Sequence, residues 1–424
     1  MASRILRRRA ATAFGVYGAA ILGFLATVVA ARELSKDDFA RFALAFGTTT
    51  LLQTFVDLTI DEVVIKYGNR YAAREDWGRF HRLFRVGMLV KLIGGAVGTV
   101  AVVVAAFLSP LVWKTSGVEG ALLIASLIPL IQQPEGMAGA VLTLRSRYDL
   151  RAYALLWSMA LRLTAVSVGA PHGLLPLFVG LVAAQLVATA SVSYVALLAY
   201  RRYPQRPPEP LGDDRPAIRA FAVQSTIASG LASMRTSLPT VLVGIVAKGT
   251  QVANFRAAQA PQTAFLSLSG PARLVLLAEQ TRDVEHGRPD RAHTLLRRYI
   301  GAATLIAAVV TPPLWIFMPT IVRVVYHAKY LPATNAFRLM LLAAVLQFVF
   351  GWTKTFPVSI GRPGMRSVGQ ALEIAILVPG VLVLGALYGA TGAAGGMLAG
   401  SVVLAAFWTL GLLRLPRPEA APAA

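Results

Sequence analysis

Charged and amide side chains interrupt several long apolar stretches of this sequence. Arg162 and Arg235 each fall near the middle of such a stretch, and Gln132, Gln133 and Glu135 gather in another. A charge at mid-bilayer costs about 2.5–3.5 kcal/mol, so such a side chain usually faces a cavity or a partner. Two interpretations stay open. Either Glu135 forms a purely structural ion pair with Arg162, or these groups line a wet, cationic cavity that holds one carboxylate.

Other polar side chains lie nearer the ends of their apolar stretches. Gln259 and Gln262 share roughly one helix face with Arg256, and Gln53 and Asp57 lie toward the inner end of their stretch.

Long cationic side chains near a helix end can extend to the membrane surface, which is called snorkelling. We expect Lys91 to snorkel. For Arg41, Arg256 and Arg338 two interpretations are open, snorkelling and a role in binding. Glu373 is shallow in its stretch, and we expect it to meet a loop arginine.

No pattern typical of catalysis occurs. The five His residues are scattered without the spacing of metal ligands, there is no Cys, and no Walker A motif is present. Asp213 and Asp214 stand alone in a loop, where we expect them to be solvated. No loop is long enough for a soluble catalytic domain. We therefore predict a protein that is not an enzyme and has no cofactor and no metal.

Composition identifies the elements that must position these side chains. The chain has 424 residues, of which 56% are hydrophobic and only 14% charged, and its mean hydropathy is +0.62. Apolar runs of about 20 residues are the length of a membrane-spanning helix. We predict an all-α, polytopic membrane protein with about twelve spans: 10–31, 39–60, 86–108, 120–143, 153–170, 174–199, 219–246, 250–277, 299–322, 334–354, 367–389 and 391–413.

The basic residues predict the orientation of these spans. If the N-terminus is cytoplasmic, 29 of the 41 Lys and Arg residues fall in inner segments and six in outer segments. This is the bias of the positive-inside rule, and it predicts that both termini are cytoplasmic. The net charge of +21 then reflects topology and anionic membrane lipid rather than nucleic-acid binding.

The chain divides near its middle. A Pro- and Arg-rich segment, 200–218, separates two sets of six spans, 1–199 and 219–413, and a disordered cytoplasmic tail, 414–424, follows. Two short matches at offsets of 212 and 213 residues, each in register with the spans, indicate a duplicated six-span bundle. Parallel repeats of this kind suit a transporter with a central cavity between the two bundles.

Several short motifs resemble one family of transporters. They are 31–42 around the start of the second span, 55–58 at its end, Val252 to Ala258, Tyr330 with Ala333, Gly361-Arg362-Pro363, and Gly389 to Gly395. Together they resemble the Wzx-type polysaccharide flippases of the multidrug/oligosaccharidyl-lipid/polysaccharide (MOP) exporter superfamily, whose fold is MATE-like. The chain departs from that family in span 7, where Arg235 stands in a region that commonly contains an Asp.

The resemblance implies alternating-access transport of a polyprenyl-pyrophosphate-linked oligosaccharide from the inner to the outer leaflet of a bacterial cell membrane, for cell-surface polysaccharide biosynthesis. Its implied partners are that lipid-linked substrate, membrane lipids and glycan-assembly proteins, with no nucleic acid. The roles expected of its residues are three: pyrophosphate binding by Arg162, Arg235, Arg256 and Arg41, sugar binding by Gln132, Gln133, Gln259 and Gln262, and coupling or charge pairing by Asp57 and Glu135.

Three other functions remain open at this point. A MATE-like drug or cation antiporter would need buried carboxylates, whereas arginines outnumber acids in mid-membrane here. A lipid II flippase has a similar fold but typically two further spans. A membrane glycan polymerase or ligase is disfavoured by the short outer loops.

Overall fold

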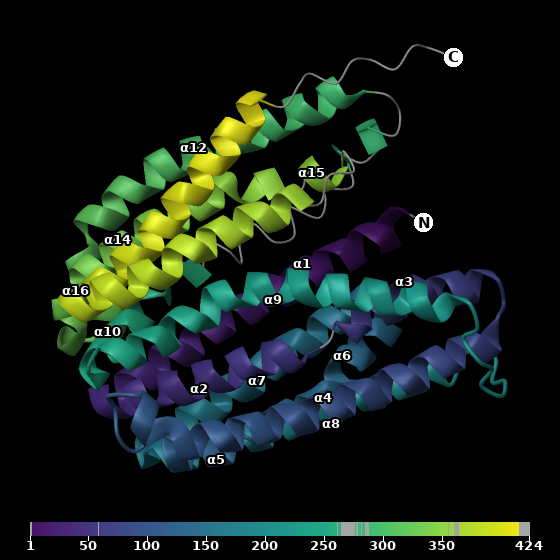
Figure 1. The fold of residues 1–424 in the computed structure, drawn as a ribbon, viewed down its shortest axis with the longest axis horizontal. Coiled ribbons are helices and arrows are strands. Elements are labelled where there is room, and N and C mark those ends of the chain that lie inside the picture. Colours follow the sequence, from purple (N-terminus) through teal and green to yellow (C-terminus); the bar gives the residue numbers. More distant parts are fainter. Residues whose placement is uncertain are drawn as a thin grey trace. The chain divides into compact units, whose positions relative to one another are not determined.

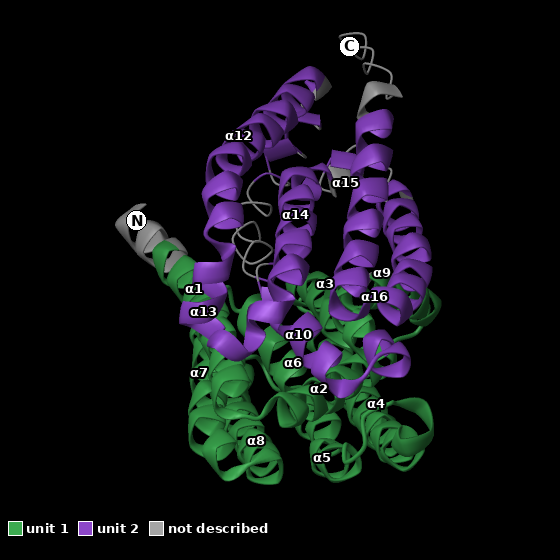
Figure 2. Ribbon diagram, turned by 90° about the vertical axis from the view of Figure 1, so that its left-hand side faces the viewer, with its two compact units in different colours: residues 1–241 green, residues 242–424 purple. Residues whose placement is uncertain are grey.

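The computed structural model describes residues 2–57, 59–260, 262–263, 276, 279–280, 282–284, 288–354, 356–359 and 364–414. These residues form helices and no strand. The Gly361-Arg362-Pro363 turn, most of the second half of the predicted span 250–277 and residues 415–424 of the predicted tail lie outside the described residues. The chain divides into two compact units, residues 1–241 and 242–424 (Figure 2).

Unit 1 contains the helices from α1 to most of α9 (Figure 1). Their bounds are α1 Ala2–Glu33, α2 Lys36–Val56, α3 Ile60–Ala73, α4 Trp77–Val112, α5 Glu119–Ala125, α6 Ile128–Leu144, α7 Tyr148–Gly169, η1 Ala170–His172, α8 Leu174–Tyr200 and α9 Asp214–Val246. Within it α1 packs along α7, α7 and α6 pack on α8, and α4 packs on α6.

Unit 2 contains the remaining helices. Their bounds are α10 Gly249–Ala258, α12 Pro289–Ile316, α13 Met318–Tyr326, η2 Ala328–Ala333, α14 Thr334–Phe350, η3 Gly351–Lys354, α15 Phe356–Ser359 and α16 Gly364–Arg414. The long α16 contains one non-helical residue, Gly389, with φ of +59°. A positive φ is readily adopted only by glycine, so this residue divides α16 at the boundary predicted between the last two spans.

The predicted helical membrane architecture is confirmed. Eight helical segments of the described chain are long and apolar enough to cross a membrane by length and composition alone. Two shorter helices in series, α5 and α6, occupy the predicted span 120–143. Residues 62–85, which lie between the predicted spans 39–60 and 86–108, form most of α3 and the start of α4.

Glycines allow α4 to approach its neighbours closely. A Cβ at Gly95 would lie 2.6 Å from Cγ of Gln133 and 3.0 Å from Cα of Leu130, both on α6. A Cβ at Gly94 would lie 2.8 Å from the carbonyl oxygen of Val56, the last residue of α2. Gly94 and Gly95 therefore allow α4 to pack closely against α6 and against the end of α2.

The predicted linker packs on unit 1. The backbone N–H of Glu209 donates to the carbonyl of Gly78 at 3.1 Å, and the ring of Tyr203 lies 4.8 Å from that of Phe80. Asp214 was expected to be solvated, and this was wrong. It accepts a hydrogen bond from the hydroxyl of Tyr71 at 3.0 Å and is also close to Arg70 and Arg79, which fixes the start of α9.

Candidate functional site

A polar cavity of about 380 Å³ lies inside unit 1, between α2, α6, α7 and α8. Its polar lining residues are Thr49, Thr50, Gln53, Thr54 and Asp57 from α2 and its C-cap, Gln132 and Glu135 from α6, Ser158 and Arg162 from α7, and Gln185 from α8. Phe46, Ile128, Leu155, Met159, Leu181 and Ala184 complete the wall. The size and the mixture of apolar walls with converging polar groups are those of a ligand site.

The threonines of α2 present acceptors to this cavity. Thr49, Thr50 and Thr54 each donate their hydroxyl hydrogen to the carbonyl four residues earlier, at 2.8, 2.8 and 2.9 Å. A hydroxyl that has donated its single hydrogen keeps lone pairs for accepting. This row can therefore receive hydrogen bonds from a ligand rich in O–H groups.

Carboxamides connect the walls of the cavity. Gln53 donates to Oε1 of Gln132 at 3.1 Å, which joins α2 to α6. Gln185 on α8 donates to Glu135 at 2.9 Å and to Thr189 at 3.0 Å. Because both bonds of Gln185 use its amide nitrogen, its carbonyl oxygen is left to accept.

Arg162 contributes the guanidinium of the cavity lining. It lies over the ring of Phe46, 4.2 Å from the ring centroid, which is a cation–π contact. The ion pair between Glu135 and Arg162 that the sequence left open is not formed among the described residues. Glu135 accepts its hydrogen bond from Gln185 instead. The lining therefore carries a guanidinium on α7 and a carboxylate on α6 as separate groups.

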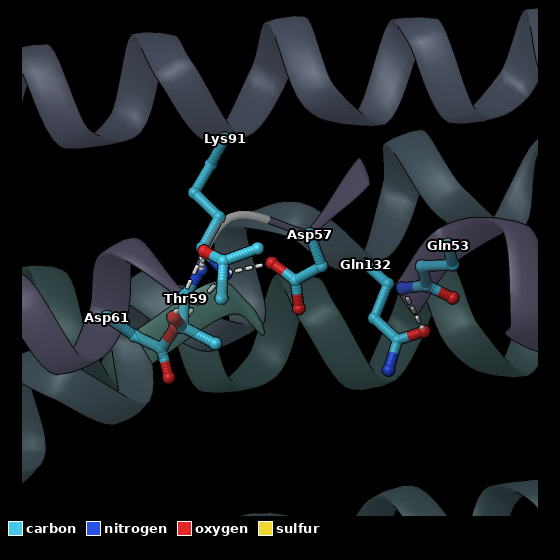
Figure 3. A network of polar contacts seen from close by, with 7 residues as sticks. Gln53, Asp57, Thr59, Asp61, Lys91 and Gln132 are labelled. Atoms are coloured by element: carbon cyan, nitrogen blue, oxygen red, sulfur yellow. Dashed lines mark hydrogen bonds and ion pairs between the residues drawn. The ribbon is translucent and has the colours of Figure 1, made fainter. Parts of the chain in front are cut away.

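Asp57, at one end of the cavity, is bound by Lys91 of α4 (Figure 3). The Lys91 ammonium also lies 3.2 Å from Oδ1 of Asp61, and Lys91 is only 4% exposed. The expectation that Lys91 snorkels to the membrane surface was therefore wrong. A Cβ at Gly136 would lie 3.3 Å from Nζ, so the neighbour of Glu135 leaves room for this ammonium.

The Lys91 pair lies where the chain passes from α2 to α3. α2 ends at Val56, its C-cap residue Asp57 donates its backbone N–H to the carbonyl of Gln53 at 2.7 Å, and α3 begins at Ile60. The backbone N–H of Thr59 donates to the hydroxyl of Thr226 on α9 at 3.2 Å, and Ser225 donates to Glu62. The ions and α9 together hold this break in place.

Unit 2 contains a second buried network of amides. Gln262 donates to Oε1 of Gln347 at 2.9 Å, and Gln347 donates to Ser401 at 2.8 Å and to Glu373 at 3.4 Å. Glu373 is 1% exposed. Its Oε1 accepts the hydrogen bond from the amide of Gln347, and the expected contact with a loop arginine stays a prediction.

The remaining predicted site residues lie outside the cavity lining. Arg41 donates to Asp38 and to the carbonyl of Ser116, both at 2.9 Å. Gln133 is buried against α4. Arg235 is partly buried on α9.

Arg256 and Gln259, which belong to unit 2, hydrogen-bond to each other at 2.9 Å. The grouping of Arg41, Arg162, Arg235 and Arg256 around one pyrophosphate stays a prediction.

One residue of the site, Gln185, was missed from the sequence, and the position of another, Lys91, was predicted wrongly. Gln185 belongs to the same class as the predicted glutamines, an amide inside an apolar span, and that signal would have found it. Lys91 was noticed but given little weight, since its carboxylate partners belong to a different segment of the chain.

A family model matches most of the chain. Residues 5–276 match the family described as polysaccharide biosynthesis protein. None of the curated proteins matches the chain.

Solved structures of MOP superfamily members share the fold. An inward-facing multidrug resistance MATE family transporter of the MOP superfamily has 15% identity and a TM-score of 0.79, covering 93% of this chain and 94% of its own. The lipid II flippase MurJ in an inward closed conformation has 13% identity and a TM-score of 0.73, covering 95% and 87%.

A MOP superfamily transporter from Pyrococcus furiosus, whose binding pocket is described as having reversed polarity, has 14% identity and a TM-score of 0.66. It covers 96% of this chain and 94% of its own. The helical spans and these fold relatives together identify a multi-pass membrane protein.

Proposed function

Because this chain belongs to the polysaccharide biosynthesis protein family, we propose that it is a flippase for a polyprenyl-pyrophosphate-linked oligosaccharide. It carries this lipid from the inner to the outer leaflet of a bacterial cell membrane, for cell-surface polysaccharide biosynthesis. The observation that carries the proposal is the polar cavity in unit 1, set among membrane-spanning helices.

The lining of the cavity suits a sugar better than an apolar compound. Sugars present many O–H groups, each of which donates and accepts. The back-bonded threonines, the carboxamides and Glu135 offer acceptors at several heights along α2, α6 and α8. A buried polar wall without such a ligand or water would be costly, since an unsatisfied buried group costs about 1–3 kcal/mol.

Arg162 supplies the positive charge that an anionic part of the substrate requires. A pyrophosphate crossing the membrane needs counter-charges because burying it alone is prohibitive, and the planar guanidinium binds phosphate at two points. We place Arg162 first among the pyrophosphate ligands, since it lines the cavity. Arg41, Arg235 and Arg256 complete the proposed set, with Gln132, Gln259 and Gln262 for the sugars.

The lipid movement follows from alternating access. We propose that units 1 and 2 rock so that the cavity opens to each leaflet in turn, with both termini on the cytoplasmic side. The cytoplasmic arginines then face anionic lipid. Glycan-assembly proteins deliver the lipid-linked sugar to the inner leaflet.

The test is the replacement of Arg162 in cells whose surface polysaccharide depends on this protein. Arg162→Gln removes the charge but keeps a polar side chain, and we expect export to fall by about tenfold or more, the effect of losing one strong charged contact. Arg162→Lys, which keeps the charge but loses the two-point geometry, should be intermediate. Surface glycan and lipid-linked glycan inside the cell are measured together.

Arg151→Gln is the matched control, because Arg151 is an exposed arginine on the same helix, outside the cavity lining. Normal glycan display with Arg162→Gln at normal protein level would contradict the proposal. An efflux assay separates the second function that the cavity allows: Glu135 favours a cationic substrate, so drug resistance gained on expression would identify a MATE-like antiporter.

A further inference from the structure

An apolar groove lies on unit 2 between α12 and α14. Thr311, Pro312, Trp315, Ile316 and Leu342 line a hollow of about 420 Å³. Pro312 and Ile316 are exposed, and further along the same helix Leu305 and Val309 are 68% and 65% exposed. In a membrane this side of α12 meets hydrocarbon rather than water, so the natural occupant of the groove is a lipid chain.

A guanidinium stands beside this groove. Nε of Arg338 on α14 donates to the carbonyl of Trp315 at 3.3 Å, and the guanidinium lies 5.5 Å from the centroid of the Trp315 ring. Arg338 precedes Leu342 by one helical turn, so both occupy one face of α14. The bond to Trp315 uses one of the five N–H donors of a guanidinium fork that suits a phosphate.

The position along the helices matches the shape of an anionic lipid. Trp315 is next to the last residue of α12, and Arg338 is in the first turns of α14, so the guanidinium is near the helix ends. The groove extends from there along α12 toward its middle, through Thr311. A phosphate would therefore lie near the membrane surface and the chain deeper in the hydrocarbon.

We propose that this groove binds a polyprenyl phosphate, with the phosphate on Arg338 and the first isoprenoid units on Trp315, Ile316 and Leu342. The inference rests on the proposed function, which brings such a lipid to the protein. The methyl branches of an isoprenoid also make it wider than a straight acyl chain. They would fill a broad hollow between a proline ring and an indole with more dispersion contacts.

The test is lipid binding by the purified full-length protein in detergent, with undecaprenyl phosphate as the probe and phosphatidylglycerol as the competitor. Undecaprenyl phosphate has no sugar, and every sample also carries Arg162→Gln, so the guanidinium proposed to bind phosphate in the unit 1 cavity is removed from the comparison. Leu342→Trp fills the groove and Arg338→Gln removes the charge, and we expect each to weaken binding by about tenfold. Val402→Trp, at an exposed position of α16, and Arg323→Gln, at an exposed position of α13, are the matched controls and should stay within about twofold.

Two results would overturn the inference: equal displacement by phosphatidylglycerol, which means a general anionic-lipid groove, or unchanged binding by both groove variants. Gel filtration and thermal melting show whether Leu342→Trp is folded. If it is not, undecaprenyl phosphate binding by the two single variants Arg338→Gln and Ile316→Ala tests the groove instead. The proposed function is judged separately, because loss of glycan display in Arg162→Gln cells requires no lipid binding at Arg338. If the groove variants bind the lipid normally but Arg162→Gln cells lose glycan display, the groove inference is wrong and the flippase proposal is still supported.

Discussion

Lys91 binds Asp57 across the point at which α2 ends and α3 begins, and Asp61 lies on its other side. An ammonium that is 4% exposed would be costly without these carboxylates, and two carboxylates this close would repel each other without the ammonium. The three charged groups therefore form one cluster, the Lys91 cluster, which fixes the helix break at the end of the cavity.

Replacing Lys91 by Met should destabilise unit 1. The methionine fills similar volume but leaves Asp57 and Asp61 facing each other, and loss of a charged hydrogen bond costs about 2 kcal/mol of unfolding free energy. The measurement is the apparent melting temperature of the purified protein in detergent, with glycan display in cells.

Lys66→Met is the control for this change, because Lys66 is an exposed lysine on α3 that lies over the ring of Phe221. Adding Asp57→Asn to Lys91→Met should recover part of the lost stability, since it removes one of the repelling charges. If Lys91→Met has the melting temperature of the wild type, the Lys91 cluster does not hold the helix break between α2 and α3.

Gly95→Ala should also destabilise the protein. The new methyl group would meet Gln133 at 2.6 Å and the α6 backbone at 3.0 Å, so α4 and α6 must separate, and overpacking of this kind costs about 1–3 kcal/mol. Gly301→Ala on α12 is the counterpart: apart from its own helix backbone and chain neighbours, no described residue has an atom within 4 Å of its Cβ position, so the helix propensity of alanine should give a neutral result or a gain of about 0.5–1 kcal/mol. A thermal melt in which the two variants behave alike would refute the close α4–α6 contact.

The helical membrane fold could be predicted from the sequence because hydropathy and basic-residue bias depend on local composition. The division of the last apolar region at Gly389 was likewise visible as a glycine-rich turn. The helix α3 was not predicted, because its charged residues suggested a loop. Its inward face is nonetheless apolar, with Val63, Val64 and Tyr67 buried in a common core.

The cavity was predicted only in part. Arg162, Gln132, Glu135 and Asp57 do line one space, as expected of polar groups inside apolar spans. Gln133 faces α4 instead, because neighbouring residues of a helix point in directions about 100° apart and cannot share one wall. The pairing of Lys91 with Asp57 and Asp61 depends on which helices pack together. The spacing of residues within one segment of the sequence does not contain that information.

Each half has a pair of hydrogen-bonded amides in its second and fourth predicted spans. Gln53 with Gln132 joins the second and fourth predicted spans of the first half, and Gln262 with Gln347 joins the second and fourth of the second half. This correspondence is what a duplicated bundle would produce. In unit 1 the pair borders a cavity, whereas in unit 2 Gln347 is 2% exposed and is part of a closed network.

Gln347→Ala should therefore affect stability directly. It leaves Gln262 and Ser401 without their bonds to the amide in a buried site, at a cost of about 1–3 kcal/mol. Thr304→Ala, which removes an exposed hydroxyl bonded to its own helix, is the control and should be neutral. Melting temperatures in detergent compare the two, and an unchanged value for Gln347→Ala would mean that the network contributes nothing net.

Glu135 distinguishes charge from shape in the cavity. Glu135→Gln keeps the size of the side chain and an oxygen that can accept from Gln185, but it loses the charge that strengthens hydrogen bonds to sugar hydroxyls. We expect glycan export to fall by about tenfold, which corresponds to about 1.4 kcal/mol. Glu135→Leu should abolish it, because Gln185 then faces an apolar group.

Export rates are measured by the appearance of surface glycan after induction, with Glu119→Gln, at the start of α5 and outside the cavity lining, as the control. Full export by Glu135→Leu would show that the carboxylate of Glu135 does not contribute to the proposed site. Restored or increased export of a more acidic glycan by Glu135→Gln would instead show that this carboxylate selects against negative sugars, because repulsion by Glu135 is lost while Arg162 remains.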